Sequence, residues 1–254
     1  MQHKEQPHGA GVAPAGVNKI INGDTVEVMR TMQTDSVDMV FTSPPYNCGN
    51  SGKNKDMYAF YSDDLSDEDY FNLLNDSLRE SVRLSRGLVF FNLNFMKNNY
   101  KVIFRWLHEN SDTFKDIMVW DKKRVQPPIG NILGKRAEFI FIFSKSNAVI
   151  NDFRNNKAEK YKDMFGSWLS NILQLGINTD DNDAKIHRAG FPTELPRIFI
   201  DMYTKKGDTI LDPFVGCGAT AVASKTLGRN FIGIDLNNEY CEVSRSRLSQ
   251  DSLL

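Results

Sequence analysis

Short apolar runs alternate along this chain with longer stretches in which apolar residues recur every three or four positions. Apolar runs of about four to eight residues are typical of buried strands, and the helical spacing predicts amphipathic helices. The predicted strands are 19–22, 37–41, 88–93, 117–120, 137–143, 209–212 and 231–235. The predicted helices are 25–32, 66–86, 100–109, 192–203, 219–227 and 238–248. This alternation predicts an α/β fold with a doubly wound, mostly parallel sheet of seven strands.

Three segments depart from the alternation. Residues 1–16 are rich in Gly, Ala, Pro and His and are expected to form a disordered tail, with 17–254 as a single domain. Residues 48–64 are polar and predict a long loop, which compact domains usually use as a lid or a binding loop. Residues 147–186 are rich in Asn, Asp and Lys and are expected to be an insert rather than a core strand and helix.

Composition excludes several classes of protein. The 254 residues are 41% hydrophobic and 25% charged, as in ordinary globular domains. The sequence contains no long apolar run, so no membrane span is expected. The three cysteines form no Cys-x-x-Cys pair, so neither a disulfide framework nor a zinc site is expected, and a reducing cytoplasm suits the chain.

The net charge of -1 argues against a uniformly basic nucleic-acid binder, but the charge is uneven. Residues 115–162 contain eleven Lys and Arg against five Asp and Glu, an excess of six (11 - 5). A local excess of this kind is suited to contact with phosphates. A solvated surface with a chance surplus of positive charge is the alternative interpretation.

The strand predicted at 37–41 runs into Thr-Ser-Pro-Pro-Tyr-Asn at 42–47. Neither proline can donate a backbone hydrogen bond, so the turn is stiff and ends the strand. In an open α/β sheet, the carboxyl ends of the strands are where ligands bind. The Ser43 hydroxyl and the Pro44 carbonyl are suited to accept hydrogens from an amino group on a base, and Tyr46 is suited to stack on the base. A plain strand-ending turn is the alternative.

A second turn lies between a predicted strand and a predicted helix at 212–220, with the sequence Asp-Pro-Phe-Val-Gly-Cys-Gly-Ala-Thr. Gly216 and Gly218 permit a tight turn and the close approach of a ligand. The next strand ends in Asp235, and an acid there can bind both hydroxyls of a ribose. The pattern indicates a cofactor that contains a nucleoside. Because the third glycine of the dinucleotide fingerprint is missing, a nicotinamide dehydrogenase is disfavoured.

Together, the motifs at 42–47 and 212–218 resemble those of the amino-group DNA methyltransferases, which use S-adenosylmethionine. The order, with the catalytic motif before the cofactor motif, resembles the permuted β group of that family. Further resemblance lies at 22–29, at 187–195 with its His-x-Ala-x-Phe-Pro pattern, and at 233–240. The resemblance implies a circularly permuted, Rossmann-like methyltransferase fold in which 147–186 recognises the target sequence.

The resemblance also implies roles for individual residues. The catalytic residues would be Ser43, Pro44, Pro45 and Tyr46. The cofactor would be bound by Asp24, Phe191, Pro192, Asp212, Pro213, Phe214, Gly216, Gly218 and Asp235, and no metal is required. The DNA phosphates would be contacted by Lys122, Lys123, Arg124, Lys135 and Arg136. For Asp24, a simple helix cap is the alternative.

The serine before Pro-Pro-Tyr favours the N4 amine of cytosine as the target, with the N6 amine of adenine as the alternative. The expected partner is double-stranded DNA with a flipped target base, and no membrane. A homodimer and a cognate restriction endonuclease are further hypotheses that the resemblance raises. An RNA or protein methyltransferase and an inactive DNA-binding module are competing interpretations, which the permuted order and the two intact motifs disfavour.

Overall fold

The computed structural model describes residues 16–49, 64–123, 133–148, 158–165, 170–176 and 190–250. The predicted tail, most of the predicted lid loop, much of the segment 147–186, and Arg124 lie outside the described residues. The elements in chain order are β1 (Lys19–Asn22), α1 (Thr25–Arg30), β2 (Met39–Thr42), α2 (Asp67–Leu84), β3 (Val89–Leu93), α3 (Tyr100–Glu109), β4 (Phe114–Asp121), β5 (Ala137–Phe143), α4 (Ala158–Phe165), β6 (Ile172–Gln174), α6 (Glu194–Tyr203), β7 (Thr209–Asp212), α7 (Ala219–Thr226), β8 (Asn230–Asp235) and α8 (Asn238–Gln250).

The strands form one mixed sheet in the order β1-β8-β7-β2-β3-β5-β4-β6. Only β5 runs antiparallel to its neighbours, so the sheet is mostly parallel, as predicted. β1 pairs in parallel with β8 along its whole length, from Lys19 opposite Ile232 to Asn22 opposite Asp235. The first described strand thus lies beside the last, as the predicted permutation requires.

The prediction of seven strands was wrong, because the described sheet has eight. The additional strand, β6, lies within the segment predicted to be an insert and pairs in parallel with β4. Leu173 of β6 and Tyr161 of α4 are both buried in the core. The described part of this segment is therefore packed onto the sheet rather than separate from it.

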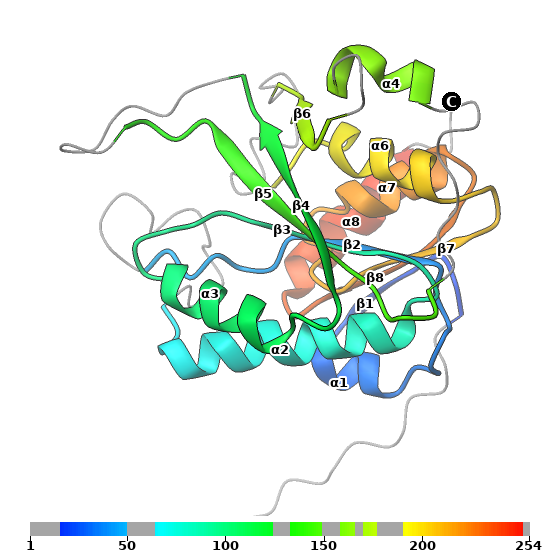
Figure 1. The fold of residues 1–254 in the computed structure, drawn as a ribbon. Helices are drawn as coiled ribbons and strands as arrows, with labels where there is room; N and C mark the ends of the chain where they lie inside the picture. The colour runs from blue at the N-terminus through cyan, green and yellow to red at the C-terminus, as the bar shows by residue number, and fades with distance from the viewer. Residues whose placement is uncertain are drawn as a thin grey trace, which may run out of the picture.

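Helices cover both faces of the sheet (Figure 1). α1, α2 and α3 pack on one face, where Met29, Leu78 and Trp106 meet strand residues such as Phe91. α6 and α4 pack on the other face, where Phe199 lies within 5.3 Å of Phe41 between ring centroids. α7 and α8 complete that second face beside β1 and β8. No described helix is long and apolar enough to cross a membrane.

Most helix boundaries follow the signals in the sequence. Ser66 caps α2 by accepting a hydrogen bond from Asp69 N at 3.1 Å, and acidic residues occupy the first turn. β2 begins two residues later than predicted because Val37 makes only an isolated bridge, to Ser85. This later start of β2 does not change the position of the turn that follows the strand.

Candidate active site

The two turns singled out in the sequence meet at the centre of the sheet. β2 and β7 are parallel neighbours, and the chain proceeds from them toward opposite edges of the sheet. This is a topological switch point, where α/β sheets open a crevice at the carboxyl ends of their strands. Thr42, the last residue of β2, donates a hydrogen bond of 2.7 Å from Oγ1 to Oδ1 of Asp212, the last residue of β7. The turn at 43–46 and the turn at 213–218 therefore start side by side.

Asp212 is a buried acid with an incomplete set of partners. Only 2% of the residue is exposed, and its Oδ1 also accepts a hydrogen bond from Phe214 N at 3.1 Å. Oδ2 is buried with the Thr220 hydroxyl nearby, and it makes no hydrogen bond of full geometry to a described residue. Burial raises the pKa of the Asp212 carboxyl from 3.8 to about 6. A buried polar atom without a partner is the kind of group that a ligand satisfies.

The glycine turn after β7 is tied to β8. Gly216 N donates to Oδ2 of Asp235 at 3.0 Å, and Asn237 N donates to Oδ1 at 2.8 Å. Burial raises the pKa of the half-buried Asp235 carboxyl, and the two backbone N–H groups oppose this shift. These bonds fix the Asp235 carboxylate at the carboxyl end of β8, next to the glycine turn.

The glycine turn packs closely against α8, where a side chain would not fit. Gly218 has a φ of +86°, and a Cβ there would lie 2.8 Å from Ser244 Oγ. Gly216 also has a positive φ, of 49°. The turn, the unpaired oxygen of Asp212 and the acid at the end of β8 fit a nucleoside cofactor that carries a charged or polar amino-acid group.

The remaining predicted cofactor residues border the same region. Asp24 accepts a hydrogen bond from Glu27 N at 3.0 Å and so caps α1, while the next residue, Thr25, donates to the Pro213 carbonyl at 2.5 Å. The Phe191 ring contacts Phe41 edge-on at 5.6 Å between centroids. Pro192 precedes α6, and its carbonyl accepts a hydrogen bond from Leu195 N at 2.9 Å. The capping role of Asp24 is therefore observed, and a role toward a cofactor stays a prediction.

The Ser-Pro-Pro-Tyr turn is held by side chains from two other segments and by the side chain of the adjacent Asn47. Tyr70 of α2 donates to the Pro45 carbonyl at 2.9 Å, and Asn99 donates from Nδ2 to the Tyr46 carbonyl at 2.6 Å. Asn47 has a φ of +53° and exchanges two hydrogen bonds with the Leu65 backbone. The turn is thus braced at several successive residues, while Ser43 and Tyr46 themselves are only half-buried.

Two polar residues beneath this turn, Asn92 of β3 and Glu138 of β5, were not predicted from the sequence. Both form hydrogen bonds with the hydroxyl of Tyr46, and Lys122, which was predicted to contact DNA, pairs with Glu138. Glu138 lies opposite Trp120 in the β4–β5 register, and Asn92 lies opposite Ile140 in the β3–β5 register. The available signal was a polar residue inside each of two apolar strands, Val-Phe-Phe-Asn-Leu and Ala-Glu-Phe-Ile-Phe.

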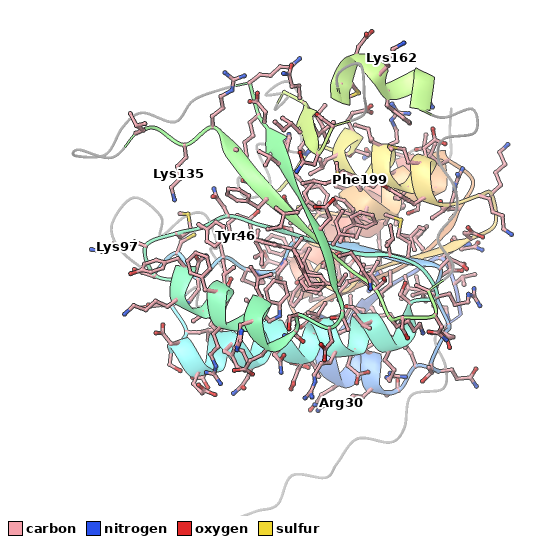
Figure 2. The ribbon with its side chains drawn as sticks, viewed as in Figure 1. Arg30, Tyr46, Lys97, Lys135, Lys162 and Phe199 are labelled. Carbon is pink, nitrogen blue, oxygen red and sulfur yellow. The ribbon has the colours of Figure 1, made fainter. Side chains whose placement is uncertain are left out.

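The residues predicted to contact DNA are mostly engaged within the protein. The Lys122 ammonium pairs with Glu138, and its side chain is only 15% exposed, which favours a role inside the site over contact with a phosphate. Arg136 donates from Nη2 to Oδ2 of Asp121 at 2.6 Å, and the Lys123 N–H donates to Oδ1 of the same carboxylate at 2.9 Å. Figure 2 shows the Lys135 side chain on the extended segment before β5, and its Nζ donates to the Phe95 carbonyl. Phosphate contact by Lys123, Lys135 and Arg136 stays a prediction.

Comparison with known proteins agrees with the arrangement of the fold. Residues 37–246 match the model of the N6/N4 methyltransferase family, described as DNA methylase. The match covers most of the chain and both turns. The protein belongs to this DNA methylase family.

Similar sequences include two Type II methyltransferases. M2.DpnII of Streptococcus pneumoniae, a Type II methyltransferase, is 28% identical over 250 residues, which cover 92% of this chain and 90% of that protein. The Type II beta methyltransferase M.BslI of Bacillus sp. (strain NEB-606) is 27% identical over 262 residues, which cover 90% of this chain. The chain spans only 27% of the length of M.BslI.

Similar solved structures share the fold. The PvuII DNA methyltransferase, described as cytosine-N4-specific, superposes with a TM-score of 0.67 at 18% identity, over 92% of this chain and 87% of that one. TTHA0409 of Thermus thermophilus, complexed with S-adenosyl-L-methionine, gives a TM-score of 0.65 at 22% identity, over 91% of this chain and 95% of that one. The predicted methyltransferase fold is thereby confirmed.

Proposed function

We propose that this protein transfers a methyl group from S-adenosylmethionine to the exocyclic N4 amine of cytosine in double-stranded DNA. The observation that carries the proposal is the hydrogen bond between Thr42 and Asp212, because it joins the Ser-Pro-Pro-Tyr turn to the glycine turn. A group bound on the glycine turn and a base bound on the other turn would then be neighbours. This arrangement supplies the alignment that a direct transfer between two bound molecules needs.

The residues around the glycine turn have distinct roles in this proposal. Asp235 accepts hydrogen bonds from the ribose hydroxyls, and the Asp212 carboxyl and the backbone at 214–216 bind the amino-acid end of the cofactor. Phe191 and Pro192 line the same pocket, with Asp24 near the adenine amino group. When bound, the cofactor supplies a methyl group on a positively charged sulfur, which is already a strong methyl donor.

The catalytic turn acts on the amine. The lone pair of an exocyclic amine is delocalised into the base, so the amine is a poor nucleophile while it stays planar. The Ser43 hydroxyl and the Pro44 carbonyl accept hydrogen bonds from the two N–H groups of the amine. These bonds favour a tetrahedral nitrogen, whose lone pair then points at the methyl group. Tyr46 stacks on the extruded base. The nitrogen would form a bond to the methyl carbon as the bond between that carbon and the cofactor sulfur breaks, and it would then release one proton to solvent at the half-buried turn.

Cytosine N4 is preferred over adenine N6 because a serine hydroxyl, rather than an Asp or Asn side chain, precedes Pro-Pro-Tyr. The cytosine-N4 specificity printed for the PvuII structural neighbour is consistent with this choice. Both amines require the same acceptors, so adenine N6 is the second candidate. The segment 147–186, including α4 and β6, is the proposed target-recognition region. A role in restriction-modification, with a cognate endonuclease, and a homodimer are parts of the same proposal.

Nucleoside mass spectrometry of plasmid DNA co-expressed with the protein tests the reaction. The wild type is expected to produce N4-methylcytosine, and Ser43→Ala is expected to reduce it at least about 100-fold, within the range for loss of a positioned acid–base group. The exposed Ser111 provides the matched control, and Ser111→Ala should leave the level unchanged.

Each other result of this experiment has a defined meaning. N6-methyladenine in place of N4-methylcytosine would overturn the choice of base. Methyl groups found only in RNA or protein, after labelling with a radioactive donor, would overturn DNA as the substrate. A wild type that binds no S-adenosylmethionine at millimolar concentration in calorimetry would support the inactive DNA-binding module.

A further inference from the structure

A chain of hydrogen bonds leads from Ser43 into the protein. Ser43 Oγ lies 3.2 Å from Tyr46 Oη and 3.1 Å from the Asn92 carbonyl oxygen. Tyr46 Oη lies 3.0 Å from Oε2 of Glu138. Asn92 Nδ2 lies 2.8 Å from Tyr46 Oη and 2.9 Å from the same carboxylate oxygen. The chain therefore ends at Glu138, a residue that is only 7% exposed.

The Glu138 carboxylate determines the direction of these hydrogen bonds. An ionised carboxylate has no proton to donate, so the Tyr46 O–H must donate to Oε2. Asn92 must face the carboxylate with its Nδ2, because its Oδ1 would be a second acceptor there. Because the Tyr46 hydroxyl already donates its proton to Glu138, its oxygen can take part in the contact with Ser43 only as the acceptor of a hydrogen bond.

The proton of Ser43 is then directed inward. Both of its acceptors among the described residues, the Tyr46 oxygen and the Asn92 carbonyl, lie on the protein side of the turn. The lone pairs of Ser43 are left for donors outside the turn. An amine on a base is a donor of this kind.

Lys122 supplies the charge that balances Glu138. Its ammonium pairs with Oε1, and the two side chains are only 15% and 9% exposed. A carboxylate at this depth without a cation would be costly to ionise. The Lys122 ammonium also lies 5.1 Å from the centroid of the Trp120 ring, which keeps it beside Glu138.

We propose that Glu138 is a positioning residue for methyl transfer: paired with Lys122, it orients the Tyr46 hydroxyl and, through it, presents Ser43 as a hydrogen-bond acceptor to the target amine. This inference rests on the proposed function and extends its site by two residues that do not touch the substrate. A buried ion pair is weak evidence for a role in stability, because apolar side chains of similar volume often replace such pairs without loss. A role in directing hydrogen bonds explains why the Lys122–Glu138 ion pair lies at the inner end of the chain of hydrogen bonds that begins at Ser43.

Glu138→Gln tests the inference with little change of shape. The amide can donate to the Tyr46 oxygen, which frees the Tyr46 proton to point at Ser43 and occupy the lone pair that the amine needs. We expect kcat to fall about 10- to 100-fold, which corresponds to losing a hydrogen bond to a charged group. The KM for S-adenosylmethionine and the Kd for DNA should stay within about twofold, since Glu138 touches neither. Glu109→Gln, in an exposed ion pair with Arg105, is the matched control and should leave kcat unchanged.

A double-mutant cycle with Tyr46→Phe separates positioning from a purely structural effect. If Glu138 acts through the Tyr46 hydroxyl, adding Glu138→Gln to Tyr46→Phe should cost no more than about a further twofold in kcat. Effects that multiply would overturn the inference, as would a Glu138→Gln variant with the kcat of the wild type. A parallel rise in the KM for the cofactor would indicate general damage to the site and would also overturn it.

A second variant protects the test against failure to fold. The double variant Glu138→Met, Lys122→Met removes both charges at similar volume and is expected to fold. It should show the same low kcat with an unchanged KM for the cofactor, and wild-type kcat would overturn the inference. Wild-type protein is assayed first, because absence of DNA methylation there would overturn the proposed function itself, and this inference with it.

Discussion

Thr42 and Asp212 are separated by 170 positions in the sequence, and a buried hydrogen bond of 2.7 Å joins their side chains. Each is the last residue of its strand, so the bond fixes where the two strands end relative to one another. The two turns that follow are those which the sequence indicated for binding a base and a cofactor. Their separation is therefore set by the sheet and by this one bond, rather than by either loop.

Replacing Thr42 with valine should destabilise the protein. Valine keeps the shape of threonine but removes the donor, and the buried Asp212 loses one of its partners. We expect the free energy of unfolding to fall by about 1–3 kcal/mol in urea titrations, the usual cost of a buried group left unpaired. Thr31→Val removes an exposed hydroxyl that bonds to Val28 O and should change stability by less than about 0.5 kcal/mol. Equal effects of the two substitutions would contradict this account.

Asp212 should make the ligand-free protein less stable as pH rises. Its pKa is raised from 3.8 to about 6 by burial, so between these values the folded protein holds a proton that the unfolded chain releases. The free energy of unfolding therefore falls as pH increases through this interval, by on the order of 3 kcal/mol in total. Asp212→Asn cannot ionise and should lose this dependence.

The measurement compares urea unfolding of the two proteins at pH 4.5, 5.5 and 7.5. The stability of Asp212→Asn relative to wild type is expected to increase with pH. Asp112→Asn changes an exposed acid and should show a difference from wild type that does not vary with pH. A flat difference for Asp212→Asn as well would show that the pKa of Asp212 in the folded protein is not raised above its value in the unfolded chain.

Substitution by alanine should destabilise the protein more at Gly218 than at Gly207, a glycine with the same backbone conformation. Gly218 and Gly207 have φ values of +86° and +84°, so both substitutions carry the same backbone strain. A Cβ at Gly218 would also lie 2.8 Å from Ser244 Oγ, whereas nothing lies within 4 Å at Gly207. We expect Gly218→Ala to cost at least about 1 kcal/mol more than Gly207→Ala in thermal or urea unfolding. Weaker binding of S-adenosylmethionine should accompany only Gly218→Ala, and equal costs would rule out the close contact with α8.

Tyr161 should hold α4 against α6. Its hydroxyl donates to Oδ2 of Asp201 at 2.7 Å, and Lys160 donates to the same oxygen at 2.7 Å. Tyr161→Phe removes the buried donor while keeping the ring, at an expected cost of about 1 kcal/mol. Hydrogen exchange should accelerate in 158–176 before it does in the rest of the sheet. Tyr100→Phe, on an exposed part of α3, is the control, and uniform acceleration across the protein would argue against a local role.

Much of the fold could be predicted from the sequence because its strands are apolar and its turns carry clear signals. The strand at 137–143 and the helix at 100–109 were predicted with the boundaries observed, and the pairing of β1 with β8 agrees with the permutation that the family resemblance implied. β6 could not be predicted, because its three residues are too few to show a period and lie within a polar segment. Its place depends on bonds to β4, which a local pattern does not contain.

The same limit explains what was missed at the candidate site. The motif residues were visible because proline and glycine mark turns wherever they fall. Glu138 and Asn92 belong to strands, and which polar strand residues meet depends on the register between β3 and β5. Lys122 was interpreted as a residue for DNA contact because charge counts do not show that an ammonium already has a buried partner. Sequence patterns identify positions where the backbone turns. Which side chains from different strands contact one another can be seen only once the sheet is assembled.

The pairing of β1 with β8 has a consequence for how the protein is made. Residues 19–22 leave the ribosome more than 200 residues before their hydrogen-bonding partner at 232–235 is translated. At about 5–20 residues per second, the early strand waits for at least ten seconds with its backbone unpaired. During that interval the chain already carries the Ser-Pro-Pro-Tyr turn but lacks Asp235. If Asp235 has the role proposed above, a nascent chain holds no complete cofactor site until this residue has been translated, so it cannot transfer methyl groups before then.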